Sequence, residues 1–305
     1  MNKQFSQESK VFIIAKESGQ LGNRLVLFAH FIAFAIENNL VIMNSAFDEY
    51  ADFFETTSKD SFCCYPPKLI FKGNKVVRKG FRLLTSFAMR LMNFATKNKV
   101  NLNQAKIITA NNWQERVSLD SPKFYSSLKH QKVIFTQGYC FRANSYFADN
   151  ADRIREYFTP IEKYRYNVLS LINSIKSSSD ILVGVHIRHG DYKTWKNGKY
   201  FFSIEQYVEI MKQVKKVFFE KTVAFLICSN ANCDKNIFAD FNVAFGSNHI
   251  LEDMYALAQC DYIIGVPSSY NRWAAFYGSV PLYTIERPEE NISLDSFKVY
   301  QVPQC

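Results

Sequence analysis

A cluster of side chains that can act chemically occurs in the second half of the chain: His186, Arg188, His189 and Asp191. An arginine keeps its charge and offers a planar set of N–H donors, a histidine exchanges a proton near neutral pH, and an aspartate accepts one. Two interpretations are open. Either these side chains form a binding or catalytic site, or Arg188 and Asp191 form a surface ion pair of little consequence.

The residues around this cluster predict the element that positions it. Ile181–Ile187 is an apolar, largely β-branched run of strand length, and Gly190 with Asp191 indicates a turn directly after it. Open α/β sheets bind ligands just beyond the carboxyl ends of their strands. We therefore expect the cluster at a ligand-binding edge of a sheet.

The rest of the chain alternates between short apolar runs and segments with helical spacing, which predicts an α/β protein. Strands are predicted at 11–15, 40–43, 107–110, 133–136, 181–187, 222–228, 243–245, 262–265 and 281–285. Helices are predicted at 25–37, 144–158, 161–174, 203–219, 251–259 and 268–277. A length of 305 residues suits two domains, and we predict Rossmann-like domains over 1–165 and 175–305.

Two other segments have residue types suited to binding an anion. Gly19 and Gly22 precede the helix predicted from Leu25, so the backbone can turn tightly near a helix N-terminus. Ser268 and Ser269 stand where a strand is expected to become a helix. Each segment also has an ordinary explanation, a strand-to-helix turn for the first and a helix cap for the second.

These segments together resemble motifs of the α-1,2-fucosyltransferases of glycosyltransferase family 11 and, more loosely, of the wider α-1,2/α-1,6/protein-O-fucosyltransferase group. Residues 186–192 are similar to the family signature HxRxGDY, residues 19–23 to its GxLGNQ loop, and residues 265–275 to its serine-rich segment. The resemblance implies the GT-B fold, in which two Rossmann-like domains face each other. The N-terminal domain would bind the acceptor and the C-terminal domain the nucleotide sugar.

The same resemblance implies an inverting glycosyltransferase that moves L-fucose from GDP-fucose to a hydroxyl of a glycan or surface polysaccharide, with O2 of a galactoside as the expected position. Arg188 would hold the β-phosphate and stabilise the charge that develops on the leaving group. No DxD motif is evident, so we expect no metal and no cofactor besides the donor substrate. The residues expected to bind the donor are His186, Arg188, Gly22, Asn23, Asp253, Ser268, Ser269, Ser229 and Asn230.

Several roles stay open. The base that takes the acceptor proton could be Asp191, His189 or Glu17, and Asp191 could instead fix the arginine fork. Asp253 could bind the ribose or orient its loop.

The chain also departs from the family pattern. It has His189 for a second arginine and Pro267 for an asparagine, while Arg24 replaces a glutamine and could share the leaving-group charge. A transferase using another nucleotide sugar, or a non-catalytic nucleotide-sugar-binding module at a membrane surface, therefore remains an alternative.

The net charge of +9 is concentrated, because no acidic residue occurs between Asp60 and Glu115. Apolar residues at helical spacing between Phe81 and Phe94 predict an amphipathic helix there. We favour packing of this helix on the core, with peripheral membrane contact of the basic segment 68–106 as the alternative. No nucleic-acid-binding motif accompanies the charge, so we expect no nucleic acid partner.

Scattered cysteines in an odd count and the lack of a signal-like N-terminus predict a cytoplasmic protein, at most peripheral to the inner face of the membrane.

Overall fold

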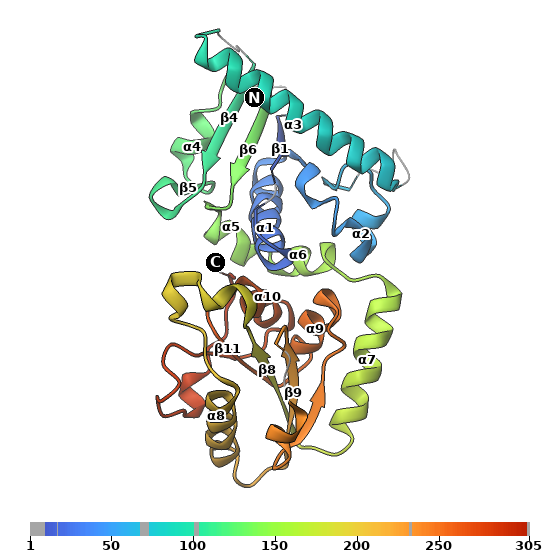
Figure 1. The fold of residues 1–305 in the computed structure, drawn as a ribbon. Helices are drawn as coiled ribbons and strands as arrows, with labels where there is room; N and C mark the ends of the chain where they lie inside the picture. The colour runs from blue at the N-terminus through green and yellow to red at the C-terminus, as the bar shows by residue number, and fades with distance from the viewer. Residues whose placement is uncertain (1–9, 17, 68–72, 101–103, 232–233, 304–305) are drawn as a thin grey trace, which may run out of the picture. The chain divides into compact units, whose positions relative to one another are not determined.

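The chain divides into two compact units, Met1–Ile161 and Glu162–Cys305 (Figure 1). The structure is a computed structural model that describes residues 10–16, 18–67, 73–100, 104–231 and 234–303. The second unit begins earlier than the predicted residue 175, because helix α7 (Glu162–Lys176) packs on helix α9 (Ile250–Leu257) within it.

The first unit is built on a five-stranded sheet with the strand order β3-β2-β1-β6-β4. Its strands are β1 (Val11–Ile14), β2 (Val41–Asn44), β3 (Cys64–Tyr65), β4 (Ala105–Ala110) and β6 (Val133–Gly138). All neighbours are parallel except β2 and β3. A separate parallel pair joins β5 (Val117–Ser118) to β7 (Phe141–Arg142).

Side-chain alternation along β1 determines which helix covers each face of this sheet. Phe12 contacts Phe34 of helix α1 (Leu21–Asn38) edge-on, with 5.2 Å between ring centroids. Ile13, on the opposite face, packs in a cluster with Met89 of helix α3 (Lys75–Lys97). The sheet is therefore enclosed between α1 and α3, as in a Rossmann-like layer structure.

The remaining helices of the first unit are α2 (Glu55–Ser58), α4 (Pro122–Ser126), α5 (Asn144–Asp149) and α6 (Ala151–Tyr157). The single helix predicted over 144–158 is divided into α5 and α6 at Asn150. The side chain of Asn150 is buried and its amide donates to the Glu37 carboxylate and to the Tyr146 carbonyl. This fixed amide holds the chain in a non-helical conformation at the junction.

The second unit contains a five-stranded, fully parallel sheet with the strand order β10-β9-β8-β11-β12. Its strands are β8 (Ile181–Ile187), β9 (Val223–Ser229), β10 (Asn242–Phe245), β11 (Tyr262–Gly265) and β12 (Leu282–Thr284). Helices α8 (Ile204–Val217) and α10 (Ser269–Gly278) follow β8 and β11 along the chain. Ser203 and Gln206 form a capping box at the start of α8, which is the helix predicted over 203–219.

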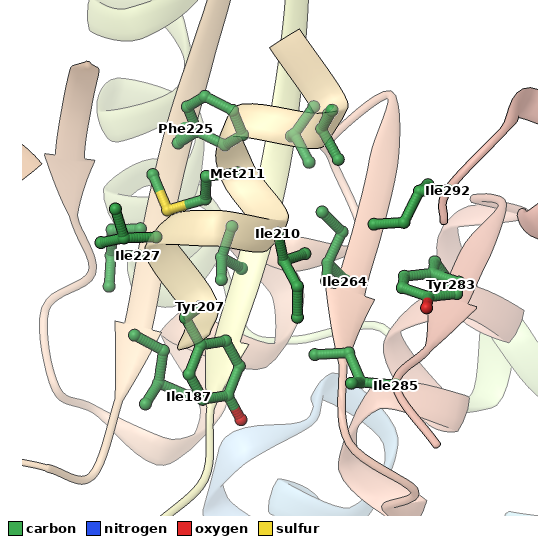
Figure 2. Close-up of a cluster of buried hydrophobic side chains, with 14 of the residues drawn as sticks. Ile187, Tyr207, Ile210, Met211, Phe225, Ile227, Ile264, Tyr283, Ile285 and Ile292 are labelled. Atoms are coloured by element: carbon green, nitrogen blue, oxygen red, sulfur yellow. The ribbon is translucent and has the colours of Figure 1, made fainter. Parts of the chain in front are cut away.

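The core of the second unit supports the end of β8. Figure 2 shows Tyr207, Ile210 and Met211 of α8 packed in one buried cluster with Ile187 of β8 and with neighbouring strand residues. The opposite face of β8 is covered by α9 and by the residues that follow it. Helices on both faces of a parallel sheet are the predicted α/β class.

Gly184 of β8 marks the closest approach between the sheet and the α9 side. A Cβ atom at this position would lie 2.5 Å from the Leu257 side chain and 3.0 Å from the Cys260 sulfur, both of which are buried. Overpacking of this kind typically costs about 1–3 kcal/mol. We therefore expect Gly184→Ala to lower the free energy of unfolding by about that amount, measured by urea denaturation.

Gly80 provides the matched control for this substitution. It lies inside α3, and a Cβ atom there would meet no atom within 4 Å. Alanine is a better helix former than glycine by about 1 kcal/mol, so Gly80→Ala should leave stability unchanged or raise it slightly. Equal losses in the two variants would show that close packing at Gly184 is not the cause.

Candidate functional site

The carboxyl ends of β8, β9 and β11 lie side by side in the second unit. β8 pairs in parallel with both neighbours, so that His186 stands opposite Gly265 of β11 and Ile187 opposite Ser229 of β9. The segments that follow the three strands therefore share one edge of the sheet, where α/β folds bind ligands. This edge brings together most of the residues that the sequence placed at the donor site.

Arg188 is held in a defined orientation at this edge. Its Nη2 atom lies 2.7 Å from a carboxylate oxygen of Asp191, and its guanidinium stands 5.5 Å from the ring centroid of Tyr192. The Arg188 side chain is 19% exposed, whereas that of Asp191 is 63% exposed. A pair this open to water adds little stability, so its main effect is to orient the guanidinium.

Tyr192 joins the signature segment to the serine segment. Its hydroxyl donates to the Pro267 carbonyl at 2.6 Å, and it also shares a hydrogen bond with the Ser268 hydroxyl. Burial raises the pKa of Tyr192 to about 12, which outweighs the opposing effect of the nearby Arg188 guanidinium. The phenol therefore stays protonated near neutral pH and acts as a permanent donor between the two segments.

His186 is a buried, neutral residue in this structure. Its ring stacks on the ring of Tyr270 with 4.7 Å between centroids. Burial, with a smaller contribution from the positive charge of Arg188, lowers the pKa of His186 to about 3. His186 therefore adds no positive charge to the site; it lies packed at the β8–α10 contact, and direct contact with a donor stays a prediction.

His189 is fixed against the segment that leads into α8. Its Nε2 atom lies 2.8 Å from the Phe202 carbonyl oxygen, and its ring lies 4.5 Å from the ring of Phe201. Because a carbonyl can only accept, Nε2 carries a proton in this contact, and Nδ1 is the ring nitrogen that can accept one. The contact fixes the orientation of the ring, and a role for His189 as general base stays a prediction.

Ser229 and Asn230, at the end of β9, support the same loop from the other side. The Ser229 hydroxyl donates to the Ile187 carbonyl at 3.1 Å, and the Asn230 amide oxygen accepts the His189 backbone N–H at 2.8 Å. Both side chains hold the backbone on either side of Arg188. Their expected contact with the nucleotide remains a prediction.

Ser268 caps helix α10, because its hydroxyl oxygen accepts the Tyr270 backbone N–H at 3.0 Å. Ser269 is the first residue of the helix. The N-terminus of α10 thus lies at the sheet edge that carries Arg188, and its dipole favours a bound anion there.

Asp253 of α9 orients the loop that follows β10. Its buried carboxylate accepts hydrogen bonds from the Ser247 hydroxyl and from the Ser247 and Asn248 backbone N–H groups. Burial raises the pKa of Asp253 to about 6 despite these bonds. A Cβ atom at Gly246 would lie 2.4 Å from this carboxylate, so only glycine fits beside it. Loop orientation is the role that these contacts provide, and ribose binding stays a prediction.

The glycine segment of the first unit differs from the predicted loop. Helix α1 begins at Leu21 rather than Leu25, so Gly22 and Asn23 lie in its first turn. Gly19 has a φ of +66° and makes the turn that leads into the helix. Gly22 and Asn23 therefore stand at a helix N-terminus, as an anion site requires. Whether they contact the donor stays a prediction.

Arg24 contacts residues of the first unit. It pairs with Glu49 at 3.1 Å and donates to the carbonyls of Gly19 and Ala46 at 3.0 Å each. This set of partners connects the start of α1 to the segment that follows β2. Whether Arg24 shares the leaving-group charge stays a prediction. The third base candidate, Glu17, lies outside the described residues.

Sequence reasoning missed a row of aromatic rings beside Arg188. Trp195 lies between Tyr192 and Tyr200, with ring centroids 4.7 and 5.5 Å away, and Lys196 stands 4.8 Å above the indole. The alternation of aromatic and lysine residues over 192–200 was the available signal.

Among the described residues, no group of three or more His, Cys, Asp or Glu side chains is arranged to hold a metal ion.

Comparison with known proteins defines the class. A family profile described as glycosyl transferase family 11 matches residues 72–291, which is well over half of the chain. The protein is therefore a glycosyltransferase. It belongs to glycosyl transferase family 11, and the resemblance predicted from the motifs is confirmed. No match was found among curated protein sequences.

Solved structures show the fold. A mutant of FUT1 from Arabidopsis thaliana in complex with GDP is 15% identical, has a TM-score of 0.65, and matches 97% of this chain and 76% of its own. The α-1,6-fucosyltransferase NodZ, soaked with GDP-fucose, is 15% identical with a TM-score of 0.54, covering 90% and 95%. POFUT1 in complex with GDP is 9% identical with a TM-score of 0.51, covering 90% and 95%. The chain has the GT-B fold of these proteins, as predicted.

Tyr192→Phe tests the link between the signature segment and the serine segment. The substitution leaves the partly buried Pro267 carbonyl without this donor, and an unsatisfied acceptor that water cannot fully reach costs up to about 1–3 kcal/mol. We expect the free energy of unfolding to fall by that amount in urea titrations.

Tyr200→Phe is the matched control, because the Tyr200 hydroxyl donates to the carboxylate of Glu286, an exposed residue that water can satisfy. The free energy of unfolding should fall clearly less in Tyr200→Phe than in Tyr192→Phe. Equal decreases in the free energy of unfolding would show that the hydrogen bond between Tyr192 and Pro267 has no special stabilising role.

Proposed function

We propose that this enzyme is a fucosyltransferase that moves L-fucose from GDP-fucose, with inversion and without a metal ion, to a glycan hydroxyl, which we expect to be O2 of a galactoside. The observation that carries the proposal is the oriented Arg188 beside the N-terminus of α10 at the carboxyl edge of β8. Membership of family 11 supports it, as does the fold shared with proteins solved with GDP or GDP-fucose.

Arg188 provides the charge that the reaction needs. When the glycosidic bond of a nucleotide sugar breaks, negative charge accumulates on the β-phosphate, and fixed donors lower the barrier by stabilising it. The guanidinium binds two phosphate oxygens at once and remains charged at every relevant pH. Together with the α10 dipole it replaces the charge that a metal ion would supply, which is the basis for proposing a metal-independent reaction.

The acceptor hydroxyl must lose a proton as it attacks the anomeric carbon. The carboxylate of Asp191 pairs with Arg188, whereas the Phe202 carbonyl orients the His189 ring through Nε2 and leaves Nδ1 as the nitrogen that can accept a proton. We therefore propose His189 as the general base and Asp191 as the residue that positions the Arg188 fork. The histidine that replaces a second arginine would then be an adaptation rather than a loss.

The other donor contacts follow from the position of each residue. Ser268 and Ser269 would hold phosphate at the start of α10, and His186, Ser229, Asn230 and Asp253 would keep the surrounding loops in place or touch the nucleoside. Gly22 and Asn23, at the start of α1, remain candidate donor contacts from the first unit. We propose that the first unit binds the acceptor and the second the nucleotide sugar.

We further propose that the enzyme works in the cytoplasm at the inner face of a membrane, where it adds fucose to a surface polysaccharide. The basic segment 68–106 supports this location, because positively charged residues are attracted to anionic lipid surfaces. Among the described residues, no helix is long and apolar enough to cross a bilayer.

A direct assay tests the reaction and its metal requirement. We expect purified protein with GDP-fucose, EDTA and a β-galactoside to give a product fucosylated at O2, identified by mass spectrometry and NMR. Product only with another nucleotide sugar would overturn the donor assignment, and product only with added divalent cations would overturn metal independence. A protein that fails to bind GDP would contradict the whole proposal.

Arg188→Ala should lower turnover by about 100-fold or more, since removing one preorganised donor to a developing anion has effects of this size. Arg287→Ala is the matched control, because Arg287 also pairs with an acidic residue three positions later, Glu290, but is 70% exposed and lies after β12. Near-normal turnover in Arg188→Ala, or equal losses in both variants, would refute the role of Arg188.

His189→Gln and Asp191→Asn distinguish the two base candidates. If His189 is the base, His189→Gln should abolish the acidic limb of the kcat pH profile, while Asp191→Asn should keep that limb and mainly weaken GDP binding. Loss of the limb in Asp191→Asn alone would reverse the assignment.

A further inference from the structure

Helix α3 exposes a large apolar face. Helix α3 packs on the rest of the first unit through Arg78, Thr85 and Met89. Phe81 and Met92 are partly buried beside them. The apolar residues on its other side are more than half exposed, from 53% for Leu91 to 79% for Val76: Val76, Leu83, Leu84, Phe87, Leu91 and Phe94. The sequence-based preference for packing is therefore wrong for most of the apolar stripe.

These exposed residues form one continuous stripe. Leu84, Phe87, Leu91 and Phe94 follow one another at intervals of three, four and three residues, which places them on the same side of the helix. From Val76 to Phe94 the stripe extends for about 27 Å at the rise of an α-helix. A contiguous apolar surface of this kind marks an interaction site, unlike single exposed apolar residues.

A row of cations borders the stripe. Lys79, Arg90 and Lys97 are separated by eleven and seven residues, close to whole helical turns, so they lie along one flank. No ion pair involves them among the described residues, whereas Arg78 and Lys75 pair with Asp52, and Arg82 with Asp48. The helix carries no acidic residue that would offset this flank.

We propose that α3 lies flat on a bilayer that contains anionic phospholipids. The apolar stripe enters the boundary between headgroups and acyl chains, and Lys79, Arg90 and Lys97 contact lipid phosphates. This proposal rests on the proposed membrane location and names the element that makes the contact. It does not depend on which sugar the enzyme transfers.

Charge argues for a lipid surface over a second copy of this chain. A dimer formed through α3 would bring two cationic flanks together with no acidic residue on either helix to pair with them, and like charges at an interface oppose association. An anionic bilayer satisfies the apolar stripe and the cations at once.

Flotation of the full-length protein with vesicles tests the proposal. We expect binding to phosphatidylglycerol-containing vesicles that weakens at least about tenfold in phosphatidylcholine alone or in high salt. The variant Phe87→Ser/Leu91→Ser/Phe94→Ser should lose binding, and Lys79→Gln/Arg90→Gln/Lys97→Gln should lose its preference for anionic lipid. The matched control is Leu169→Ser/Phe219→Ser, which alters exposed apolar residues of the second unit and should bind as the unmodified protein does.

Each outcome has a distinct meaning. Unchanged flotation of the Phe87 variant, or no flotation of the unmodified protein, would overturn the proposal. A solution dimer that this variant converts to monomer would instead assign the face to a second copy. Fucosyl transfer to a soluble galactoside without vesicles, measured for every variant, should stay unchanged. Normal fucosyl transfer without flotation would contradict only the α3 proposal. Flotation without fucosyl transfer would contradict only the proposed reaction.

Discussion

The candidate site depends on the central position of β8 in the second sheet. Because β8 pairs in parallel with both β9 and β11, three segments that are distant in the sequence leave the sheet at one edge. The apolar cluster under Ile187 fixes the end of the strand, and α9 packs against Gly184 on the opposite face. Arg188 thus follows directly on the buried end of the central strand, which holds its backbone in place before a ligand binds.

Two of the titratable side chains at this edge are uncharged near neutral pH. His186 is neutral because it is buried, and Tyr192 is neutral because burial raises its pKa to about 12. Tyr192 donates to the Pro267 carbonyl and His186 stacks on Tyr270, so both hold neighbouring segments without adding charge. Asp191 pairs with Arg188, and its exposure allows water or an incoming phosphate to take its place. Asp191 can therefore orient the Arg188 guanidinium before the donor binds, and the donor phosphate can replace Asp191 when it binds.

The sequence predicted the elements better than their contacts. All nine predicted strands are present among the described residues, because each is a continuous apolar run, whereas the two-residue strands β3, β5 and β7 are too short to show a period. The early start of α1 escaped prediction because Gln20 provides no side-chain cap. The bond between Tyr192 and Pro267 joins residues 75 positions apart, and no local pattern encodes it.

Helix α3 shows why periodicity alone does not determine orientation. An amphipathic helix normally turns its apolar side to the core. Here the docking side is partly polar: Arg78 pairs with Asp52 and donates to the Thr57 and Asp60 carbonyls, and the Thr85 hydroxyl bonds to Ser45 at 2.8 Å. Because these buried polar groups are satisfied only in this orientation, rotating the helix to bury its leucines would leave them without partners. The same contacts that anchor α3 therefore keep its apolar stripe available to another surface.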